Sequence, residues 1–283
     1  MALGVTAHRP RFAVWHVGFR RSMTATPTRH LTGRSRARLA SMDDDELAAA
    51  GARLEGEHPR DVIAWALERF TGRQRVVVTG LQAEGVAIAD MAIAIDPAVR
   101  VLTVDTGRLP EATHHYLDRL RRHWQRDIEV VHPANRELDA FVNAHGPDPF
   151  YTSAQLRLEC CHVRKVAPLE GVLRSVGCWM SGLRRRDSPG RAGTEVVERD
   201  HRHGGIVKVN PLAAWDDHEL QAHIASAGVP THPLYAQGYR SIGCAPCTRA
   251  VAPDEDHRAG RWWWEAGVDK ECGIHATPTV AAG

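Results

Sequence analysis

One stretch decides the fold: Arg75-Val76-Val77-Val78-Thr79-Gly80-Leu81-Gln82-Ala83-Glu84-Gly85, with helix-forming residues behind it up to Ile95. Its first half is a short β-branched run of the kind that forms a buried strand. Where such a strand leads through a turn into a helix, free backbone N–H groups at the start of the helix favour an anion such as phosphate. The turn lacks the lysine of a Walker loop and the G-x-G-x-x-G spacing, so a phosphate site and an ordinary turn both remain open.

The same alternation of strand and helix continues on both sides of this stretch. Upstream, residues 41–46 combine a serine hydroxyl with acidic residues, which is typical of a capped helix start, and a second helix is predicted from Pro59 to Phe70. Strands alternating with helices of ten or more residues predict βαβ units, and hence an α/β fold with a parallel sheet covered on both faces. The downstream strands are predicted at 99–104, 128–131, 178–181 and 206–209, and the helices at 110–124 and 137–145.

The composition is that of an ordinary globular protein. The 283 residues carry a formal net charge of +2, and 43% of them are hydrophobic and 25% charged. No run approaches the roughly 18–20 apolar residues that a bilayer span needs, because Asp90 interrupts the most apolar stretch, Val86 to Ile95. We therefore expect no membrane partner and, in the absence of a secretory signal, a cytoplasmic location.

The first 42 residues differ in charge from the rest of the chain. They contain eight arginines and no acid, so the remainder carries 28 − 34 = −6. Residues 1–42 are interpreted as a disordered leader or as a misassigned start, with Met23 or Met42 as the true one; a nucleic-acid arm or a transit peptide is the alternative. The acidic remainder argues against nucleic-acid binding. The remainder is divided into an α/β domain at 43–250 and a C-terminal segment at 251–283.

Ligands of such a sheet bind beyond the carboxyl ends of its strands, which makes three loops candidates: 79–85, 105–108 and 181–191. The third loop carries four arginines between residues 184 and 191, directly after a predicted strand. Guanidinium groups match the oxygens of phosphate and sulfate. This loop therefore favours an anion clamp over a merely solvated loop.

Four of the six cysteines form two pairs, the adjacent Cys160-Cys161, in a segment predicted to be helical (Leu156–Lys165), and Cys244-x-x-Cys247. Four thiolates can hold either Zn²⁺ or an iron–sulfur cluster. Two neighbouring cysteines cannot form the knuckle turn of a structural zinc site, whereas a [4Fe–4S] cubane has metal corners farther apart, so the cluster is favoured; buried, unliganded thiols are the third alternative. Cys178 lies in an apolar run and is interpreted as a small buried residue.

Cys272 lies in a polar segment near the end of the chain, between Lys270 and His275. Neighbouring cations lower the pKa of a thiol and make it a reactive thiolate. The upstream tryptophans 262–264 are interpreted as an anchor for this tail. A thiol among many cations suits nucleophilic attack on an anionic substrate, followed by rescue by another thiol.

These motifs, in this order, resemble the thioredoxin-dependent adenylylsulfate (APS) reductases, and more broadly the family that also contains the phosphoadenylylsulfate (PAPS) reductases. The resemblance runs from about Arg75 to His275 and leaves about the first 40 residues outside it. It rests on Val104-Asp105-Thr106-Gly107-Arg108-Leu109-Pro110, Cys160-Cys161-x-x-Arg164-Lys165, the arginine-rich loop, Cys244-x-x-Cys247-Thr248-Arg249, Arg258-Ala259-Gly260-Arg261-Trp262-Trp263-Trp264-Glu265 and Glu271-Cys272-Gly273-Ile274-His275.

The resemblance implies an adenine-nucleotide α-hydrolase-like (PP-loop) fold whose C-terminal tail carries the nucleophile, Cys272. Related loops often have a Ser-Phe pair where this chain has Gly80-Leu81, so backbone contacts are expected there. The implied ligands of the [4Fe–4S] cluster are Cys160, Cys161, Cys244 and Cys247. The implied substrate-binding residues are Thr79, Gly80, Gln82 and Ala83 in the loop, Val104, Thr106 and Gly182 along the adenosine, and Lys165, Arg191, Arg258, Arg261 and His275 around the phosphosulfate.

The implied reaction is the reduction of APS to sulfite and AMP in sulfate assimilation, through an S-sulfocysteine on Cys272 that thioredoxin or glutaredoxin resolves. Only eight residues follow His275, so we expect the reductant to be a separate protein and the cytoplasm to be bacterial. A PAPS or dual reductase, a zinc-stabilised nucleotide-binding sensor and an ATP pyrophosphatase are the alternatives. A homo-oligomer is compatible with the sequence.

Overall fold

The computed structural model describes residues 42–265 and residue 274, and these belong to a single compact unit. The expected leader and two expected site residues, Cys272 and His275, lie outside the described residues. None of the helices that the structure describes has the length and apolar character needed to cross a membrane. The division of the chain at residues 42 and 250 stays a prediction.

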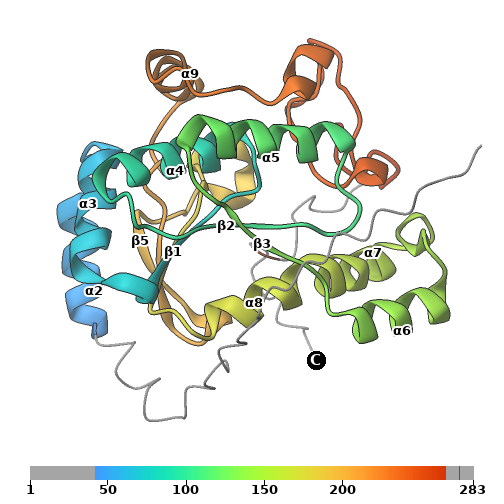
Figure 1. The fold of residues 1–283 in the computed structure, drawn as a ribbon, viewed down its shortest axis with the longest axis horizontal. Coiled ribbons are helices and arrows are strands. Elements are labelled where there is room, and N and C mark those ends of the chain that lie inside the picture. Colours follow the sequence, from blue (N-terminus) through green and yellow to red (C-terminus); the bar gives the residue numbers. More distant parts are fainter. Residues whose placement is uncertain (1–41, 266–273, 275–283) are drawn as a thin grey trace, which may run out of the picture. The chain divides into compact units, whose positions relative to one another are not determined.

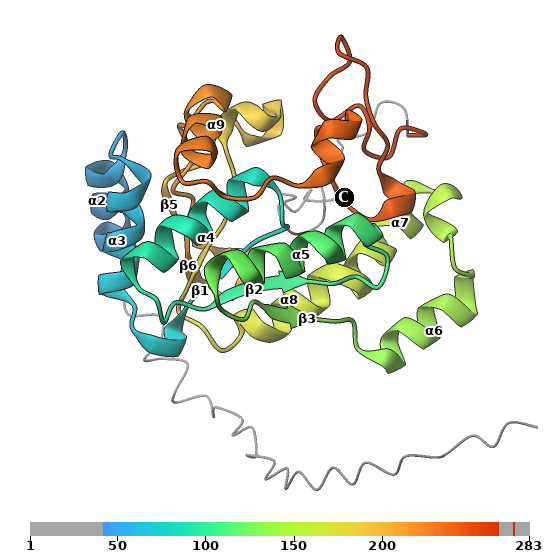
Figure 2. The same ribbon diagram turned by 45° about the horizontal axis from the view of Figure 1, so that its top comes forward.

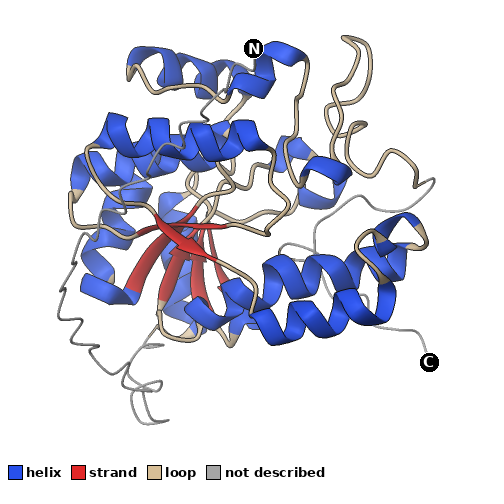
Figure 3. Cartoon of the chain, turned by 45° about the vertical axis from the view of Figure 1, so that its right-hand side comes forward, coloured by secondary structure: helices blue, strands red, loops and turns tan. Residues whose placement is uncertain are grey.

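A six-stranded sheet with the order β3-β2-β1-β4-β6-β5 forms the centre of the described structure (Figure 3). Five strands are parallel, and β5 pairs with β6 in the antiparallel direction. The α/β class with a largely parallel sheet is thereby confirmed. The strands are β1 (Arg75–Val78), β2 (Val101–Val104), β3 (Glu129–Val131), β4 (Cys178–Met180), β5 (Val197–Asp200) and β6 (Ile206–Val209).

Strand β5 is the strand that the sequence analysis missed. Three of its four residues are charged, so it lacks the apolar run of the other strands. Gly204 and Gly205 follow it with φ values of +83° and +77°, and they reverse the chain into β6. Glycine adopts such positive φ values without steric cost, which allows this tight antiparallel connection at the sheet edge.

Helices cover both faces of the sheet (Figures 1 and 2). The helices α4 and α5 lie on one face, with α2, α3 and α9 packed around the same apolar core, and α6, α7 and α8 lie on the other face. The sequence predicted all of these regions except α8 and α9. The bounds are α2 (Asp44–Leu54), α3 (Pro59–Arg69), α4 (Ala83–Ile95), α5 (Glu111–Trp124), α6 (Asn135–His145), α7 (Ala154–Cys161), α8 (Ala167–Leu173) and α9 (Asp217–Ser226).

The cap of α2 is a correction to the sequence analysis. The Asp43 carboxylate, and not the Ser41 hydroxyl, accepts a hydrogen bond from the backbone N–H of Glu46. The Glu46 carboxylate accepts from the Asp43 N–H in return, which completes a capping box. A carboxylate at this place also complements the positive end of the helix dipole.

Each central strand divides its side chains between two cores. In β1, Val77 packs into the core under α4, whereas Val76 faces α7 and α8. In β4, Cys178 is fully buried in the first core and Trp179 faces the second. This follows from the two-residue period of a strand, which points successive side chains to opposite faces. The interpretation of Cys178 as a small buried residue is confirmed.

Candidate active site

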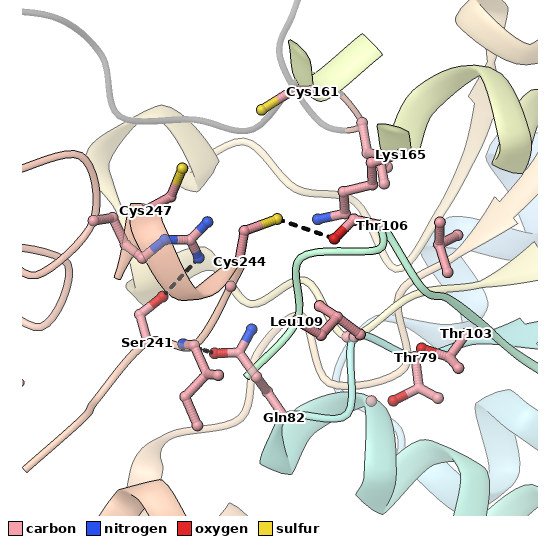
Figure 4. Close-up of a pocket in the computed structure, with 18 of the residues that line it drawn as sticks. Thr79, Gln82, Thr103, Thr106, Leu109, Cys161, Lys165, Ser241, Cys244 and Cys247 are labelled. Carbon is pink, nitrogen blue, oxygen red and sulfur yellow. Dashed lines mark hydrogen bonds between the residues drawn. The ribbon is translucent and has the colours of Figure 1, made fainter. Parts of the chain in front are cut away.

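A pocket lies beyond the carboxyl ends of β1, β2 and β4, lined by the loops that follow these strands and by α7 (Figure 4). The chain passes from β1 to β2 and β3 on one side and to β4 on the other, so the strand order reverses between β1 and β4. Ligands of open α/β sheets bind at such a reversal. The described members of the expected substrate-binding set that line it are Thr79, Gly80, Gln82, Val104, Thr106, Lys165, Gly182, Arg191, Arg258 and Arg261.

The loops after β1 and β4 touch each other because Gly182 has no side chain. A Cβ atom at Gly182 would lie 2.8 Å from the Cβ of Glu84 and 2.9 Å from the backbone nitrogen of Gly85. Gly85 is equally constrained, since its Cβ would lie 2.6 Å from the Thr79 hydroxyl oxygen. Two glycines therefore allow the two loops to close around the start of α4.

The loop after β1 is tied to the segment that precedes the second cysteine pair. The Gln82 side-chain carbonyl accepts a hydrogen bond of 2.8 Å from the Ile242 backbone N–H. The Ala83 N–H donates to the Tyr235 hydroxyl at 3.0 Å. Ala83 is thus the one described member of the expected set that does not line the pocket, because its amide already binds within the chain.

The loop after β2 is joined to the same segment. The Thr106 hydroxyl oxygen lies 3.2 Å from the Cys244 sulfur (Figure 4), and the Ala245 N–H donates to the Arg108 carbonyl at 2.8 Å. The Arg164 guanidinium, from the helix after Cys161, donates to the Thr106 carbonyl at 3.0 Å. Thr106 therefore connects the end of β2 with both cysteine-bearing segments.

All four expected ligand cysteines line the pocket. Burial raises the pKa of the Cys247 thiol to about 12, and the neighbouring Cys244, Cys161 and Cys160 thiols add to this rise. Burial also raises the pKa of Cys160, against the opposing effect of Arg164. Mutual effects of this kind require the four sulfurs to lie near one another. Among the described residues, however, no group of three or more His, Cys, Asp and Glu side chains is close enough to hold one metal ion.

One face of the helix through Cys160 and Cys161 supplies much of the lining. The lining residues recur with the i, i+3, i+4, i+7, i+8 spacing of a single helical face. A π-helical turn, η3 (His162–Val166), joins α7 to α8 within this segment, and such turns are frequent at functional sites. The sequence predicted the helix but not this turn. The lining residues of this face are Arg157, Cys160, Cys161, Arg164 and Lys165.

The Arg258–Glu265 segment closes another side of the pocket. The backbone of Arg261 forms an isolated antiparallel β-bridge with that of Thr248. The Arg261 guanidinium lies 3.3 Å from the Ser241 hydroxyl oxygen. A Cβ atom at Gly243 would lie 2.5 Å from this guanidinium, and one at Gly260 would lie 2.3 Å from the Arg249 carbonyl oxygen. Because these two glycines have no side chains, the segment can approach the second cysteine pair closely, and Arg261 can line the pocket.

The three tryptophans do not share one role. Trp262 is 1% exposed and lines the pocket, and Trp264 donates to the Phe150 carbonyl at 3.1 Å. Trp263 is 41% exposed. Trp262 and Trp264 thus pack against the described domain, whereas Trp263 is exposed. The tail that they are expected to anchor lies outside the described residues, so the anchoring stays a prediction. Ile274, which the structure also describes, is buried and lines the pocket.

Two arginines of the arginine-rich loop, Arg184 and Arg185, are held by carboxylates and are not available as the anion clamp that the sequence suggested. The buried Arg184 guanidinium contacts the carboxylates of Glu84, Asp187 and Asp217 at 2.8–3.1 Å. Arg185 pairs with a different carboxylate, that of Glu55. Carboxylates thus occupy these two guanidinium groups, whereas Arg191, which pairs with Asp187 at 3.1 Å, lines the pocket together with that residue.

The sequence analysis missed several lining residues, among them Glu84, Arg157, Asp187 and His257. Burial raises the pKa of Glu84 although the Arg184 guanidinium opposes this. For Arg157 the sequence held an indication, because it precedes Cys160 and Cys161 by three and four residues and so shares their helical face. Glu84 and Asp187 lie in two of the candidate loops, 79–85 and 181–191, but their ion pairs with Arg184 could not be read from the sequence.

Known proteins with similar sequences share one reductase domain. Residues 74–250 match the family described as phosphoadenosine phosphosulfate reductase domain. A relative from Burkholderia cepacia, named adenosine 5'-phosphosulfate reductase, is 43% identical over 199 residues, which are 70% of this chain and 79% of the relative. One of the same name from Allochromatium vinosum is 43% identical over 200 residues, 71% of this chain and 78% of that protein.

A solved structure with a similar fold agrees with this. The phosphoadenylyl-sulfate (PAPS) reductase from Candida auris, crystallised as a phosphate complex, superposes with a TM-score of 0.63 at 24% identity. The match covers 75% of this chain and 98% of that protein. Fold, pocket and sequence similarity together place this chain in the phosphoadenosine phosphosulfate reductase domain family.

Proposed function

We propose that this protein reduces adenylylsulfate to sulfite and AMP in sulfate assimilation, with Cys272 as the nucleophile. One observation carries the proposal. The loops at the switch point of the sheet, four cysteines and several cationic side chains all line a single pocket. The relatives named adenosine 5'-phosphosulfate reductase support the choice of substrate.

The nucleotide is proposed to lie at the reversal between β1 and β4. Thr79, Gly80 and Gln82 line this part of the pocket from the loop before α4, where a helix N-terminus favours phosphate. Val104 and Thr106 from the β2 end and Gly182 from the β4 end line it as well. Adenosine bound there would place its phosphosulfate toward the cysteine-bearing helix.

The phosphosulfate is proposed to bind among the cationic side chains. Lys165, Arg191, Arg258 and Arg261 come from four different parts of the chain and line the same pocket. Fixed cations stabilise the charge that develops on a leaving phosphate and on the sulfuryl oxygens better than mobile water does. His275, outside the described residues, is proposed to belong to this group.

In the proposed reaction, the Cys272 thiolate attacks the sulfur atom of adenylylsulfate. A sulfur–sulfur bond forms, the bond between that sulfur and the phosphate oxygen breaks, and AMP leaves. A thiolate of a separate thioredoxin or glutaredoxin then attacks the Cys272 sulfur and releases sulfite, and the second reductant thiol resolves the mixed disulfide. The two thiols are oxidised to a disulfide and supply both electrons.

The four cysteines that line the pocket are proposed to hold a [4Fe–4S] cluster. All four thiols line one pocket, and each iron of a cubane takes its own thiolate. The adjacent Cys160-Cys161 pair supports a cluster, because neighbouring cysteines cannot form the knuckle turn of a structural zinc site. When bound, the cluster would supply a local charge next to Lys165, which follows the Cys161 ligand by one helical turn. The Lys165 ammonium group itself is proposed to bind the sulfate.

The proposed chemistry needs a reducing environment. The Cys272 thiol and the reductant thiols must be regenerated after each turnover, and thiols are kept reduced in the cytoplasm rather than outside the cell. We therefore propose a cytoplasmic location and a separate thiol protein as the partner.

Sulfite release tests the proposal. The anaerobically purified protein is supplied with thioredoxin and either APS or PAPS, and is compared with Cys272→Ser and with Cys178→Ala, a cysteine variant outside the pocket. We expect release from APS that is lost in Cys272→Ser and kept in Cys178→Ala. Preferential release from PAPS would overturn the substrate, and no sulfite from either nucleotide in cluster-loaded protein would overturn the function.

A further inference from the structure

Two buried arginines contact the same indole. The guanidinium carbon of Arg157 lies 4.3 Å from the centre of the Trp262 ring, and that of Arg261 lies 4.6 Å from it. Arg157 and Trp262 are each 1% exposed, and Arg261 is 7% exposed. Guanidinium groups stack favourably on indole, and the interaction is stronger when water is excluded. The ring therefore links an arginine of α7 to an arginine proposed to bind substrate.

A buried carboxylate balances part of this charge. The Arg157 Nε donates to the Glu265 carboxylate at 2.7 Å, and the Glu265 side chain is 7% exposed. The Arg157 Nη1 atom has no hydrogen-bond partner although it is buried. Glu265 therefore accounts for only part of the stabilisation of this guanidinium, and the indole face supplies another part.

Trp262 is held in a backbone conformation that it would not adopt by itself. Its φ is +42°, in the left-handed region that is unfavourable for a bulky side chain. The backbone N–H of Trp262 donates a hydrogen bond of 3.3 Å to the Cys247 carbonyl, which fixes the backbone of Trp262 next to a cysteine. Surrounding contacts must maintain such a conformation, and Arg157 provides the contact from the helix side.

Arg261 has few other restraints on its guanidinium. Among the described residues, its one hydrogen bond to a side chain is a long one, 3.3 Å to the Ser241 hydroxyl, and its Nε is buried without a hydrogen-bond partner. Gly243 limits its position on another side. The indole, held in turn by Arg157, is therefore the main surface against which Arg261 is oriented.

We infer that Arg157 is a positioning residue: through the Trp262 ring and the Glu265 ion pair, it fixes the Arg261 guanidinium at the anion end of the pocket. This inference rests on the proposed function for the identity of the anion. It assigns to α7 a second task besides carrying Cys160 and Cys161, because the same helix orients a cation donated by the Arg258–Glu265 segment.

A double-mutant cycle tests this role. In the cluster-loaded Cys272→Ser protein, which cannot turn over, the dissociation constant for APS is measured for Arg157→Met, Arg261→Met and the double variant. We expect Arg157→Met to weaken APS binding about tenfold when Arg261 is present and hardly at all when Arg261 is absent. Additive losses would mean that Arg157 binds the ligand directly, and would overturn the inference.

Two controls separate positioning from general destabilisation. Arg100→Met removes an arginine that pairs with Glu129 outside the pocket, and it is expected to leave APS affinity unchanged even if the melting temperature falls. Arg157→Lys keeps the charge but loses the planar stacking group, so we expect only partial recovery. An APS affinity equal to that of the parent protein in Arg157→Met would contradict the inference.

A second readout needs no nucleotide and therefore survives failure of the proposed function. The rate at which an arginine-selective glyoxal reagent modifies Arg261 is followed by mass spectrometry in the ligand-free protein. We expect this rate to rise several-fold in Arg157→Met, because the guanidinium loses its orienting surface, while the rate at Arg75 stays constant. An unchanged rate at Arg261 would overturn the inference whatever the substrate is.

Discussion

The Thr106 hydroxyl oxygen lies 3.2 Å from the Cys244 sulfur, and this contact joins the end of β2 to the second cysteine pair. The same oxygen accepts a hydrogen bond from the Arg108 N–H. The nucleotide edge of the sheet and the cysteine site are thus connected directly through one side chain rather than through a chain of intermediates.

Replacing Thr106 by valine is expected to weaken both the cysteine site and turnover. The variant keeps the shape but loses the contact to Cys244, and a hydrogen bond of this kind contributes about 1 kcal/mol, or about fivefold in an equilibrium. Iron content per protein and kcat/KM for sulfite release measure the two effects. Thr194→Val, buried elsewhere, is the control, and a Thr106→Val protein that matches it in both measurements would contradict the expectation.

Gly182→Ala is expected to separate the loops after β1 and β4. Its Cβ atom would lie 2.8 Å from the Cβ of Glu84, and overpacking of this kind costs about 1–3 kcal/mol. Urea unfolding and AMP titration calorimetry should show a less stable protein with weaker nucleotide binding. Gly193→Ala is the matched control, because a Cβ atom there meets nothing within 4 Å. Equal behaviour of the two variants would mean that the close approach is unimportant.

Gln82→Met is expected to loosen the link between the nucleotide loop and the cysteine segment. Methionine has a similar shape but no strong acceptor, so the buried Ile242 N–H loses its partner, at a cost of about 1–3 kcal/mol. We expect AMP binding to weaken at least about fivefold, as measured by calorimetry. Gln155→Met, at an exposed helix position, should leave the affinity as it is. An unaltered affinity in Gln82→Met would show that the link does not shape the nucleotide site.

His232 should make the folded state sensitive to mild acid. Burial lowers the pKa of His232 to about 4, and its Nδ1 accepts a hydrogen bond from the Leu234 N–H, which requires the neutral ring. In the unfolded chain the imidazole takes up a proton near pH 6.5. The stabilisation of the folded state by the buried neutral ring is therefore complete above that pH, and it is lost as the pH falls toward 4. The shift corresponds to about 3 kcal/mol.

Urea unfolding at several pH values between 7.5 and 4 measures this loss. In His232→Gln, which cannot take up the proton, the free energy of unfolding should depend less steeply on pH in this range. His115→Gln, at an exposed position of α5, should keep the slope of the parent protein. A His232→Gln protein with the parent slope would show that another group is responsible.

Local patterns were enough to predict most of the architecture. The β-branched run at 75–78, the apolar helix behind it and the repeated alternation downstream identified the parallel strands and their crossover helices. These elements depend on the period of apolar residues within short windows, which the sequence displays directly. Strand β5 escaped because three of its four residues are charged, helix α8 because it has only seven residues, and helix α9 because its apolar face is weak.

The motifs also predicted which side chains share the pocket, with Ala83 as the described exception. Strand ends and helical faces fix the direction of residues such as Thr106, Cys160 and Lys165, so their convergence follows from the fold class. The role of the arginine-rich loop could not be predicted in the same way. Arg184 and Arg185 have the sequence of an anion clamp, but their carboxylate partners come from residues 55, 84 and 217 as well as from nearby Asp187.

The sequence by itself determined the α/β class, the loop that precedes α4 and the grouping of four cysteines with a set of cations. The tertiary structure alone decided which cations face the pocket and which are neutralised by carboxylates, and it brought Arg157 and Trp262 together from positions more than 100 residues apart. The physical reason is that periodicity and capping act between near neighbours in the chain. Ion pairs and ring contacts depend on distance in space, which only the packed sheet and helices establish.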